Sequence, residues 1–279
     1  MVRPHLRGLP VYKMTGSGND FVMIDARVSS PNEWTAADMA ALCARGTGLG
    51  ADGVVFLSPG SGADKVRMVY FNSDGSRAAM CGNAALCSTR LATHMGLVDG
   101  GEMLLETDAG TFESRSGTLD GRAELRFAPV AAPEAVTGIA LADGELRLAH
   151  TVVGVPHLVI LVRDLAGVPV DARGRELRHH AALGPDGANV NFVASGPEEG
   201  HWRMRTYERG VEGETLACGT GAVAAACALD HWGLTKLPVA LETRSGQVLE
   251  VRARRSRTGS YEDVWLIGEG RMVFRGLIT

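Results

Sequence analysis

One segment of this chain occurs twice, and this repeat constrains the fold more than any other feature of the sequence. The first copy reads MCGNAALCSTRLATHMGL and contains Cys81; the second reads ACGTGAVAAACALDHWGL and contains Cys218. Aligned on these cysteines (218 − 81 = 137 residues apart), the copies share the Cys-Gly step, and His94 falls on His231. Alanine-rich runs of this kind are typical of helices. The repeat therefore predicts two related halves, each offering one thiol at a helix start.

Short apolar strand patterns alternate with helical patterns in both halves, which favours an α+β fold. We expect two pseudo-symmetric domains, each a curved and mostly antiparallel sheet around a central helix. Residues 1–130 are predicted to form the N-terminal domain, to which a strand over 266–279 could return, and residues 131–265 the C-terminal domain. The segment HTVVGVPHLVILV is predicted to be one strand interrupted at Gly-Val-Pro, and AADMAALCARG a helix ended by Gly46.

The composition excludes several classes of protein. A net charge of −4 and a pI near 6.1 give the chain no overall basic character, which argues against nucleic acid as a partner. No apolar run approaches the roughly 18 residues of a membrane helix. The N-terminal sequence has no apolar core followed by a small-residue cleavage site, so we expect a cytoplasmic protein.

The five cysteines are too few, and too odd in number, for a disulfide scaffold, and no Cys/His spacing indicates a metal site. Cys43, Cys87 and Cys227 lie in apolar helical patterns and are predicted to be small buried core residues. Cys81 and Cys218 differ because Gly-Asn and Gly-Thr follow them, and we expect these polar residues to cap the helices.

A cysteine at a helix start is chemically distinctive. The unpaired N–H groups and the helix dipole there lower the pKa of a thiol and can also hold a carboxylate. Two such starts around one substrate would move a proton from one face of an atom to the other. The alternative interpretation is that both thiols are ordinary buried cysteines.

Polar residues at strand ends are further candidates for the site. The asparagines stand where a strand meets a turn, where asparagine is also a common turn former. Glu208 and Arg209 lie in a Gly-rich segment that leads to Cys218, and they could instead form a solvated surface turn. His157 lies in an apolar strand pattern that is typical of a core residue. These candidates are Asn19, Asn72, His157, Asn191, Glu208 and Arg209.

Together these residues resemble the diaminopimelate epimerases, which are amino-acid racemases that work without pyridoxal phosphate. The resemblance runs nearly end to end, and the two cysteine motifs in this order are highly specific. The matching segments are Gly16–Phe21, Gly48–Gly53, Asn72–Ser76, Met80–Asn83, Asn189–Phe192, Glu208-Arg209 and Gly213–Gly221.

The resemblance implies a role for each candidate. Cys81 and Cys218 would be the acid–base pair, in the cleft between the two domains, with His157 and Glu208 adjusting the pKa of the thiols. No metal and no other cofactor is expected. The carboxylates and other polar groups of the substrate would be bound by Asn19, Asn72, Gly82, Asn83, Asn191, Glu208, Arg209, Gly219 and Thr220. The expected partner is a small amino-acid substrate, with neither nucleic acid nor membrane, and the family pattern implies a homodimer.

The chain departs from the family pattern at several positions. Ala84 and Leu86 stand where the family usually has Gly and Arg, Val155 stands where it has Asn, and Phe274 where it has a Tyr associated with dimer contacts. The first hypothesis is epimerisation of LL-diaminopimelate to the meso isomer, for lysine and peptidoglycan synthesis. Val155 keeps open a racemase of another amino acid, such as histidine. A non-catalytic binding protein or a thiol redox sensor is the alternative from another class.

Overall fold

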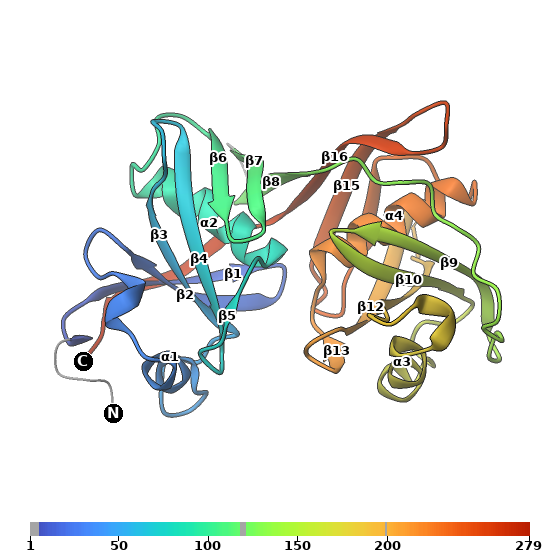
Figure 1. Ribbon diagram of the computed structural model, residues 1–279, viewed down its shortest axis with the longest axis horizontal. Helices are drawn as coiled ribbons and strands as arrows, with labels where there is room; N and C mark the ends of the chain where they lie inside the picture. Colours follow the sequence, from blue (N-terminus) through green and yellow to red (C-terminus); the bar gives the residue numbers. More distant parts are fainter. Residues whose placement is uncertain (1–5, 118–120, 199) are drawn as a thin grey trace. The chain divides into compact units, whose positions relative to one another are not determined.

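The computed structural model of the chain describes residues 6–117, 121–198 and 200–279 (Figure 1). The chain divides into two compact units, one made of Met1–Leu125 with Gly268–Thr279 and the other of Arg126–Ile267. The boundaries given above for independently folding domains, 1–130 and 131–265, stay a prediction.

The first unit is a mixed sheet with two α-helices. Strand β2 is parallel to β3, and β4 is parallel to β6, whereas the other strand pairs of the unit are antiparallel. Its strands are β1 (Pro10–Gly16), β2 (Asn19–Asp25), β3 (Gly53–Pro59), β4 (Lys65–Asn72), β5 (Arg77–Ala78), β6 (Glu102–Thr107), β7 (Gly110–Ser116), β8 (Arg122–Phe127) and β17 (Arg271–Leu277). Its helices are η2 (Pro31–Glu33), α1 (Ala36–Cys43) and α2 (Gly82–His94).

The second unit repeats this arrangement. Strand β10 is parallel to β11, β12 is parallel to β14, and the neighbouring pairs are antiparallel. Its strands are β9 (Glu145–Val153), β10 (Val155–Val162), β11 (Asn189–Ser195), β12 (His201–Glu208), β13 (Gly213–Thr215), β14 (Val239–Glu242), β15 (Val248–Arg255) and β16 (Tyr261–Glu269). Its helices are α3 (Val170–Arg178), η3 (Ala181–Leu183) and α4 (Gly219–His231).

The strand registers show how closely the two units correspond. Phe21 pairs with Gly53 in the first unit and His157 pairs with Asn189 in the second, so both partners shift by the same 136 residues. The helices α2 and α4 are both 13 residues long and begin 137 residues apart, because one residue is added between strand and helix. The predicted α+β fold and its internal repeat are confirmed.

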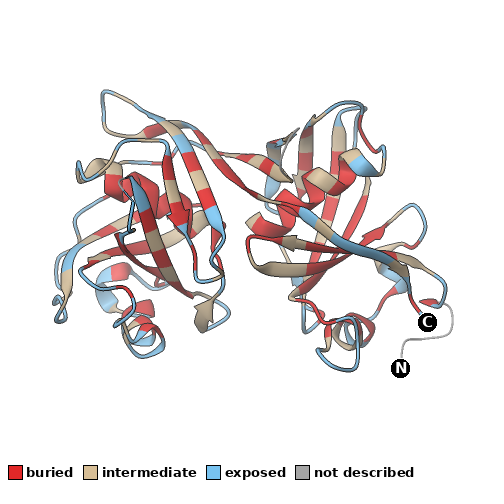
Figure 2. Ribbon diagram, turned by 180° about the vertical axis from the view of Figure 1, so that it is seen from behind, coloured by how far each residue is buried: buried red, intermediate tan, exposed pale blue. Residues whose placement is uncertain are grey.

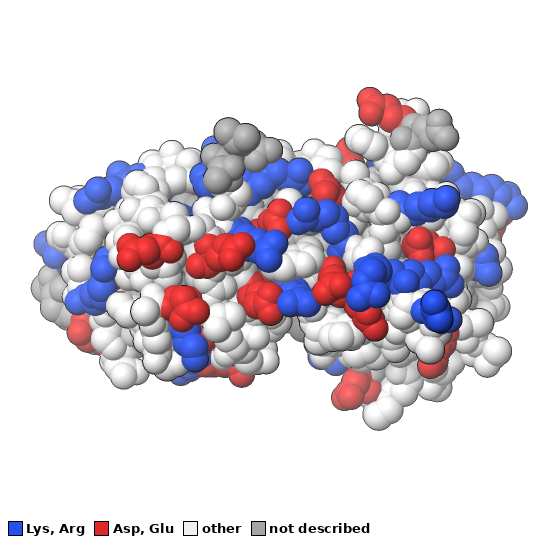
Figure 3. Space-filling model, turned by 90° about the horizontal axis from the view of Figure 1, so that it is seen from above, with Lys and Arg blue, Asp and Glu red and all other residues white. Residues whose placement is uncertain are grey.

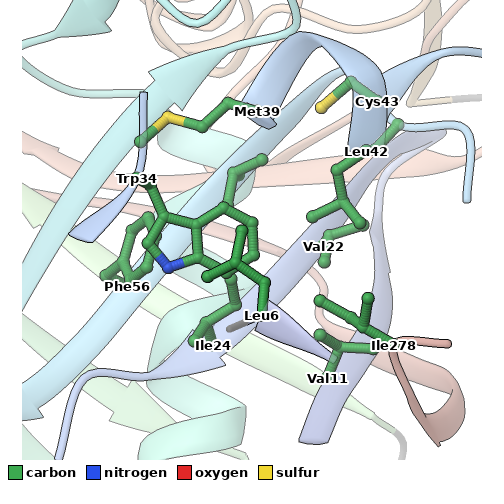
Figure 4. Close-up of a cluster of buried hydrophobic side chains, with 12 residues drawn as sticks. Leu6, Val11, Val22, Ile24, Trp34, Met39, Leu42, Cys43, Phe56 and Ile278 are labelled. Carbon is green, nitrogen blue, oxygen red and sulfur yellow. The ribbon is translucent and has the colours of Figure 1, made fainter. Parts of the chain in front are cut away.

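Each unit has its own apolar core. In the first unit, α1 packs on β3, and its Thr35–Asp38 capping box fixes where the helix begins. Figure 4 shows the cluster beneath it, where the rings of Trp34 and Phe56 meet edge to face at 5.7 Å. In the second unit the corresponding cluster includes Phe192. Most residues of the helices α2 and α4 are buried, and red prevails on the helical ribbons in Figure 2.

Two predictions of secondary structure were wrong in detail. The segment predicted as one interrupted strand is a β-hairpin, in which Gly154 adopts φ +69° between β9 and β10. An alternating apolar pattern is the same for one long strand and for two antiparallel ones, so it did not reveal the reversal. The helix predicted to end at Gly46 ends at Cys43, and Gly46, at φ +92°, belongs to the turn that follows.

The surface shows no concentration of one charge on the face drawn in Figure 3, where basic and acidic side chains are interspersed. Within the described ranges, none of the helices combines the length and the apolar character needed to span a membrane.

Candidate active site

Cys81 and Cys218 occupy the same backbone position in the two units. Each is the N-cap residue of a long helix, in an extended conformation: φ −138° and ψ 123° at Cys81, and φ −131° and ψ 112° at Cys218. The expectation that the following Asn and Thr cap the helices was wrong, because Asn83 and Thr220 are already the second helical residues. The thiol itself therefore stands at the N-terminus of each helix.

The first turn of each helix carries N–H groups that the helix cannot use. The first intrahelical bonds are made by the amides of Ala85 and Ala222, each 2.9 Å from the carbonyl oxygen of its cysteine. Helix geometry therefore leaves the amides of Gly82-Asn83 and Gly219-Thr220 without intrahelical acceptors and aligned with the positive end of the dipole. This arrangement suits a carboxylate.

The Cys218 sulfur lies within the first turn of α4. Its Sγ accepts a hydrogen bond from the Gly221 amide at 3.4 Å, and the Thr220 hydroxyl lies 3.6 Å away. A backbone N–H group directed at sulfur favours its anionic form. Cys43, Cys87 and Cys227 are buried, as predicted, and desolvation raises the pKa of all three, to about 11 for Cys43.

In the first unit, a chain of side chains links the helix start to a half-buried aspartate. The Asn83 amide donates to Asn19 Oδ1 at 2.7 Å, and the Asn19 amide donates to Asp52 Oδ2 at 2.9 Å. The same Asp52 oxygen accepts from the backbone amide of Asp20 at 3.1 Å. These contacts fix which end of the Asn19 amide is oxygen and which is nitrogen.

The carboxylates are held in turn by two basic residues. Lys13, which is buried, donates to Asp20 at 2.6 Å and to the backbone oxygen of Gly50, and Arg45 pairs with both Asp20 and Asp52. Burial alone would raise the pKa of Asp20, but the bonds from Arg45 and Lys13 outweigh it, so its pKa is lowered. The sequence prediction missed this network. Its signal was a lysine inside an apolar strand and an aspartate in each Gly-rich motif.

Asn72 lies at the end of β4, apart from these contacts. Its amide donates to Ser76 Oγ at 3.0 Å and closes the turn after the strand. It is half-buried, and its register partner on β3 is Gly53, directly after Asp52.

In the second unit, His157 and Asn191 form a buried pair. The Asn191 amide nitrogen lies 3.2 Å from His157 Nδ1, and both side chains are fully buried. Burial, with the nearby positive groups His150 and Arg209, lowers the pKa of His157 to about 3. The His157 Nε2 atom has no hydrogen-bond partner among the described residues.

Glu208 ends β12, and Arg209 follows it in the turn. Glu208 is largely withdrawn from water, which raises the pKa of its carboxyl group. The backbone amide of Arg209 donates to Asn189 Oδ1 at 2.7 Å, and within the described part of the chain no carboxylate pairs with the Arg209 guanidinium. Asn189 is a buried polar residue that the sequence prediction did not single out, although it opens the Asn-Val-Asn motif.

The structure thus groups Asn19 and Asn83 near Cys81, and groups His157, Asn191 and the start of α4 in the second unit. The roles predicted for these residues toward a substrate stay predictions.

The fold is shared with solved structures of low sequence identity. A phenazine biosynthesis protein of the PhzF family from Bacillus anthracis aligns with a TM-score of 0.74 at 14% identity, over 98% of this chain and 99% of that one. A hydroxyproline epimerase from Agrobacterium vitis, with trans-4-hydroxy-L-proline bound, aligns with a TM-score of 0.66 at 18% identity, over 98% and 92%. The chain therefore has the duplicated α+β fold of these proteins.

Sequence comparison defines the family. The sequence model described as diaminopimelate epimerase matches residues 11–121 and 150–262. Diaminopimelate epimerase of Gemmatimonas aurantiaca is 46% identical over 96% of this chain and 98% of its own length. This chain belongs to the diaminopimelate epimerase family.

Proposed function

We propose that this protein interconverts LL- and meso-diaminopimelate without a cofactor, using Cys81 and Cys218 as its two proton-carrying groups. The observation that supports this most is the equivalence of the two cysteines. Each is the extended N-cap residue of a 13-residue helix at the same place in the repeat. Membership of the family supplies the substrate.

The proposed reaction balances with the two thiols alone. One cysteine, as thiolate, removes the α-proton and becomes a thiol, and the electron pair of the broken C–H bond stays on the substrate as a carbanion. The other cysteine, as thiol, donates its proton to the opposite face and becomes a thiolate. The α-proton of an amino acid is far less acidic than a thiol, so carboxylate binding and positioning must stabilise the carbanion.

The helix starts are proposed to bind the α-carboxylate through the amides of Gly82-Asn83 and Gly219-Thr220. The Arg209 guanidinium is proposed to bind the distal carboxylate, because no side-chain carboxylate neutralises it in the described part of the chain and its planar fork suits a bidentate partner. Asn19 and Asn72 are both half-buried at strand ends and are proposed to contact other polar groups of the substrate.

His157 and Glu208 are proposed to adjust the pKa of the thiols. Burial lowers the pKa of His157 and raises that of Glu208, so both are pushed toward their neutral forms. A neutral donor near a thiol changes its pKa without supplying a competing charge.

The test is solvent deuterium incorporation at the α-carbon, followed by mass spectrometry and NMR. The protein is kept reduced and offered LL-diaminopimelate, meso-diaminopimelate and a panel of other L-amino acids. We expect exchange with both diaminopimelate isomers. Absence of exchange with every compound would refute the racemase reaction.

One observation favours a second substrate. Val155, 136 residues after Asn19, occupies the corresponding position in the second unit. A polar residue of the first unit is thus replaced by an apolar one in the second. Exchange with another amino acid, such as histidine, but not with diaminopimelate would keep the reaction and change the substrate.

The proposal includes a homodimer in the cytoplasm. Val273, Phe274 and Leu277 on β17 are 50%, 41% and 64% exposed, and this apolar row could be covered by a second copy. A cytoplasmic location suits a reaction that requires two reduced thiols. Light scattering would detect the dimer, and charge substitutions at Phe274 and Leu277 should weaken it.

A further inference from the structure

We propose that Asn191 is a positioning residue, which holds His157 as the neutral tautomer protonated on Nε2 and braces the first turn of α4 beside Cys218. This inference rests on the proposed function, because it describes how the second unit prepares groups for that reaction. It replaces the substrate contact that the sequence predicts for Asn191.

The orientation of the Asn191 amide is determined by two neighbours of fixed character. Its Nδ2 lies 3.2 Å from the backbone oxygen of Leu158, which can only accept a hydrogen bond. Its Oδ1 lies 3.0 Å from the Thr206 hydroxyl, which donates to it. A flipped amide would place two oxygens against each other at Leu158, so the nitrogen must face Leu158 and His157.

This orientation determines where the His157 ring carries its proton. Because the Asn191 Nδ2 group donates, His157 Nδ1 at 3.2 Å must be an acceptor and therefore bears no hydrogen. A neutral ring then has its hydrogen on Nε2. Burial of the ring, together with the nearby His150 and Arg209, opposes a second proton. His157 thus offers a hydrogen-bond donor at Nε2, which is buried and has no partner among the described residues.

The same amide touches the helix that carries Cys218. A Cβ atom added to Gly221 would lie under 3.0 Å from Asn191 Oδ1 and 3.2 Å from Cys218 Sγ. The absence of a side chain at Gly221 is what allows the amide to approach, and the Gly221 amide donates to the Cys218 sulfur. Asn191 therefore contacts His157 on one side and the sulfur-binding turn on the other.

The repeat supports a role particular to this unit. The residue 136 positions before Asn191 is Val55, and the residue before His157 by the same offset is Phe21. The first unit has an apolar pair where the second has an amide and an imidazole. The fold therefore does not require polar residues at these two positions. His157 and Asn191 serve a purpose other than maintaining the fold.

The tautomer can be measured directly by ¹⁵N NMR of the histidine rings in the full chain. Signals of His157 are those missing from His157→Gln. In the wild type we expect an unprotonated Nδ1 and a protonated Nε2 at neutral pH. Asn191→Asp replaces the donor with an acceptor and should move the proton to Nδ1, and Asn191→Leu should leave the two tautomers mixed. An unchanged Nε2–H tautomer in both variants would overturn the proposal.

A matched control is Thr151→Val. Thr151 is the buried register partner of His157 on β9, and its hydroxyl has no partner in the described ranges. This variant alters the same surroundings without touching the Asn191 amide and should keep the wild-type tautomer. A tautomer change there would show that general packing, rather than Asn191, sets the proton position, and would also overturn the proposal.

Kinetics separate positioning from substrate binding. With the amide directed at His157, Asn191→Leu should lower kcat on the order of 10- to 100-fold, as loss of an orienting partner commonly does, with little change in KM. A higher KM with unchanged kcat and tautomer would support the substrate contact instead. If the wild type catalysed no exchange at all, the proposed function would fail while the NMR result still decided the role of Asn191.

Discussion

Replacing Gly221 with alanine tests whether the second unit is built around the contact between Asn191 and α4. The added methyl group would fall on Asn191 Oδ1, under 3.0 Å away, with Cys218 Sγ 3.2 Å away on its other side. Asn191 is fully buried and held at both ends of its amide, so it has no free space into which to move. Overpacking of this kind typically costs about 1–3 kcal/mol.

A part of this strain is offset by the helix itself. Alanine is favoured over glycine inside a helix by about 1 kcal/mol. The expected net loss is therefore about 0–2 kcal/mol in the free energy of unfolding, measured by urea denaturation. Activity should fall more than stability suggests, because the Gly221 amide that donates to Cys218 is displaced with the turn.

The reasoning predicts a change of sign in a second background. Asn191→Ala removes the amide against which the new methyl group would clash. In that background Gly221→Ala should stabilise the protein by up to about 1 kcal/mol, because only the gain in helix propensity remains. The double-mutant cycle should therefore give a coupling energy of about 2 kcal/mol. Equal effects of Gly221→Ala in both backgrounds would refute the proposed packing.

The first unit provides a matched control. Ala84 holds the place of Gly221 in α2 and is fully buried. Ala84→Gly should destabilise the protein by about 1–2 kcal/mol, from lost helix propensity and one buried methyl group. Val55 takes the place of Asn191 in this unit. Ala84→Gly should therefore destabilise the protein whether or not Val55 is also replaced.

Three further predictions follow from the site. Cys81→Ser and Cys218→Ser should each reduce deuterium exchange with diaminopimelate by at least about 10²-fold, because a serine hydroxyl is far weaker as an acid or a base at neutral pH. Asp52→Asn should lower kcat/KM by about tenfold, since the residue loses the charge that holds Asn19. Arg45→Gln removes an exposed guanidinium from its ion pairs with Asp20 and Asp52 and should lower kcat/KM less than Asp52→Asn does. The pKa of His157 is lowered to about 3 when folded, so the unfolded chain binds a proton below about 6.5 that the folded chain does not. The free energy of unfolding therefore has its full value, as far as His157 is concerned, above pH 6.5, and it falls by up to about 1.4 kcal/mol per pH unit between pH 6.5 and pH 3. His157→Gln should make this fall less steep, as measured by urea denaturation at several pH values.

Clear outcomes would contradict each of them. Near-normal epimerisation by either serine variant would exclude two-base catalysis. Equal kcat/KM losses for Asp52→Asn and Arg45→Gln would show that charge in general, rather than the bond to Asn19, matters. A decline with pH that is the same with and without His157 would show that the ring is protonated in the folded protein.

The sequence predicted the repeat well because both copies keep the same residues at the same helix start. Cys81 and Cys218 are identical in type and are followed by glycine, so two independent patterns indicated one local structure. The spacing also carried the register: the 136-residue offset of the strands and the 137-residue offset of the helices were visible in the aligned segments.

The supporting residues could not be found in this way. Lys13 lies in an apolar strand, and its carboxylate partner Asp20 is seven residues away across a hairpin, so only the folded backbone brings them together. The sequence marked Asn191 as a polar candidate but could not predict what its side chain contacts. Its burial and its two fixed hydrogen-bond partners become evident only when β10, β11 and β12 are paired. The sequence therefore indicated which residue types take part and left open what each one faces.

Each half of the repeat braces its helix with one asparagine, but the two halves take it from different strands. In the first unit Asn19 on β2 accepts from Asn83, and its counterpart 136 residues on is Val155. In the second unit the brace is Asn191 on β11, whose counterpart is Val55. Both units therefore brace the helix with an asparagine, but from strands that do not correspond in the repeat.

The two asparagines differ in burial and in the groups that they contact. Asn19 is half-buried and tied to a charged network, so its amide can be reached by a ligand while its orientation stays fixed. Asn191 is fully buried and tied to neutral groups, so it can act only on its protein neighbours. The two braces therefore differ in burial: the asparagine of the first unit is half-buried, and that of the second unit is fully buried against an imidazole.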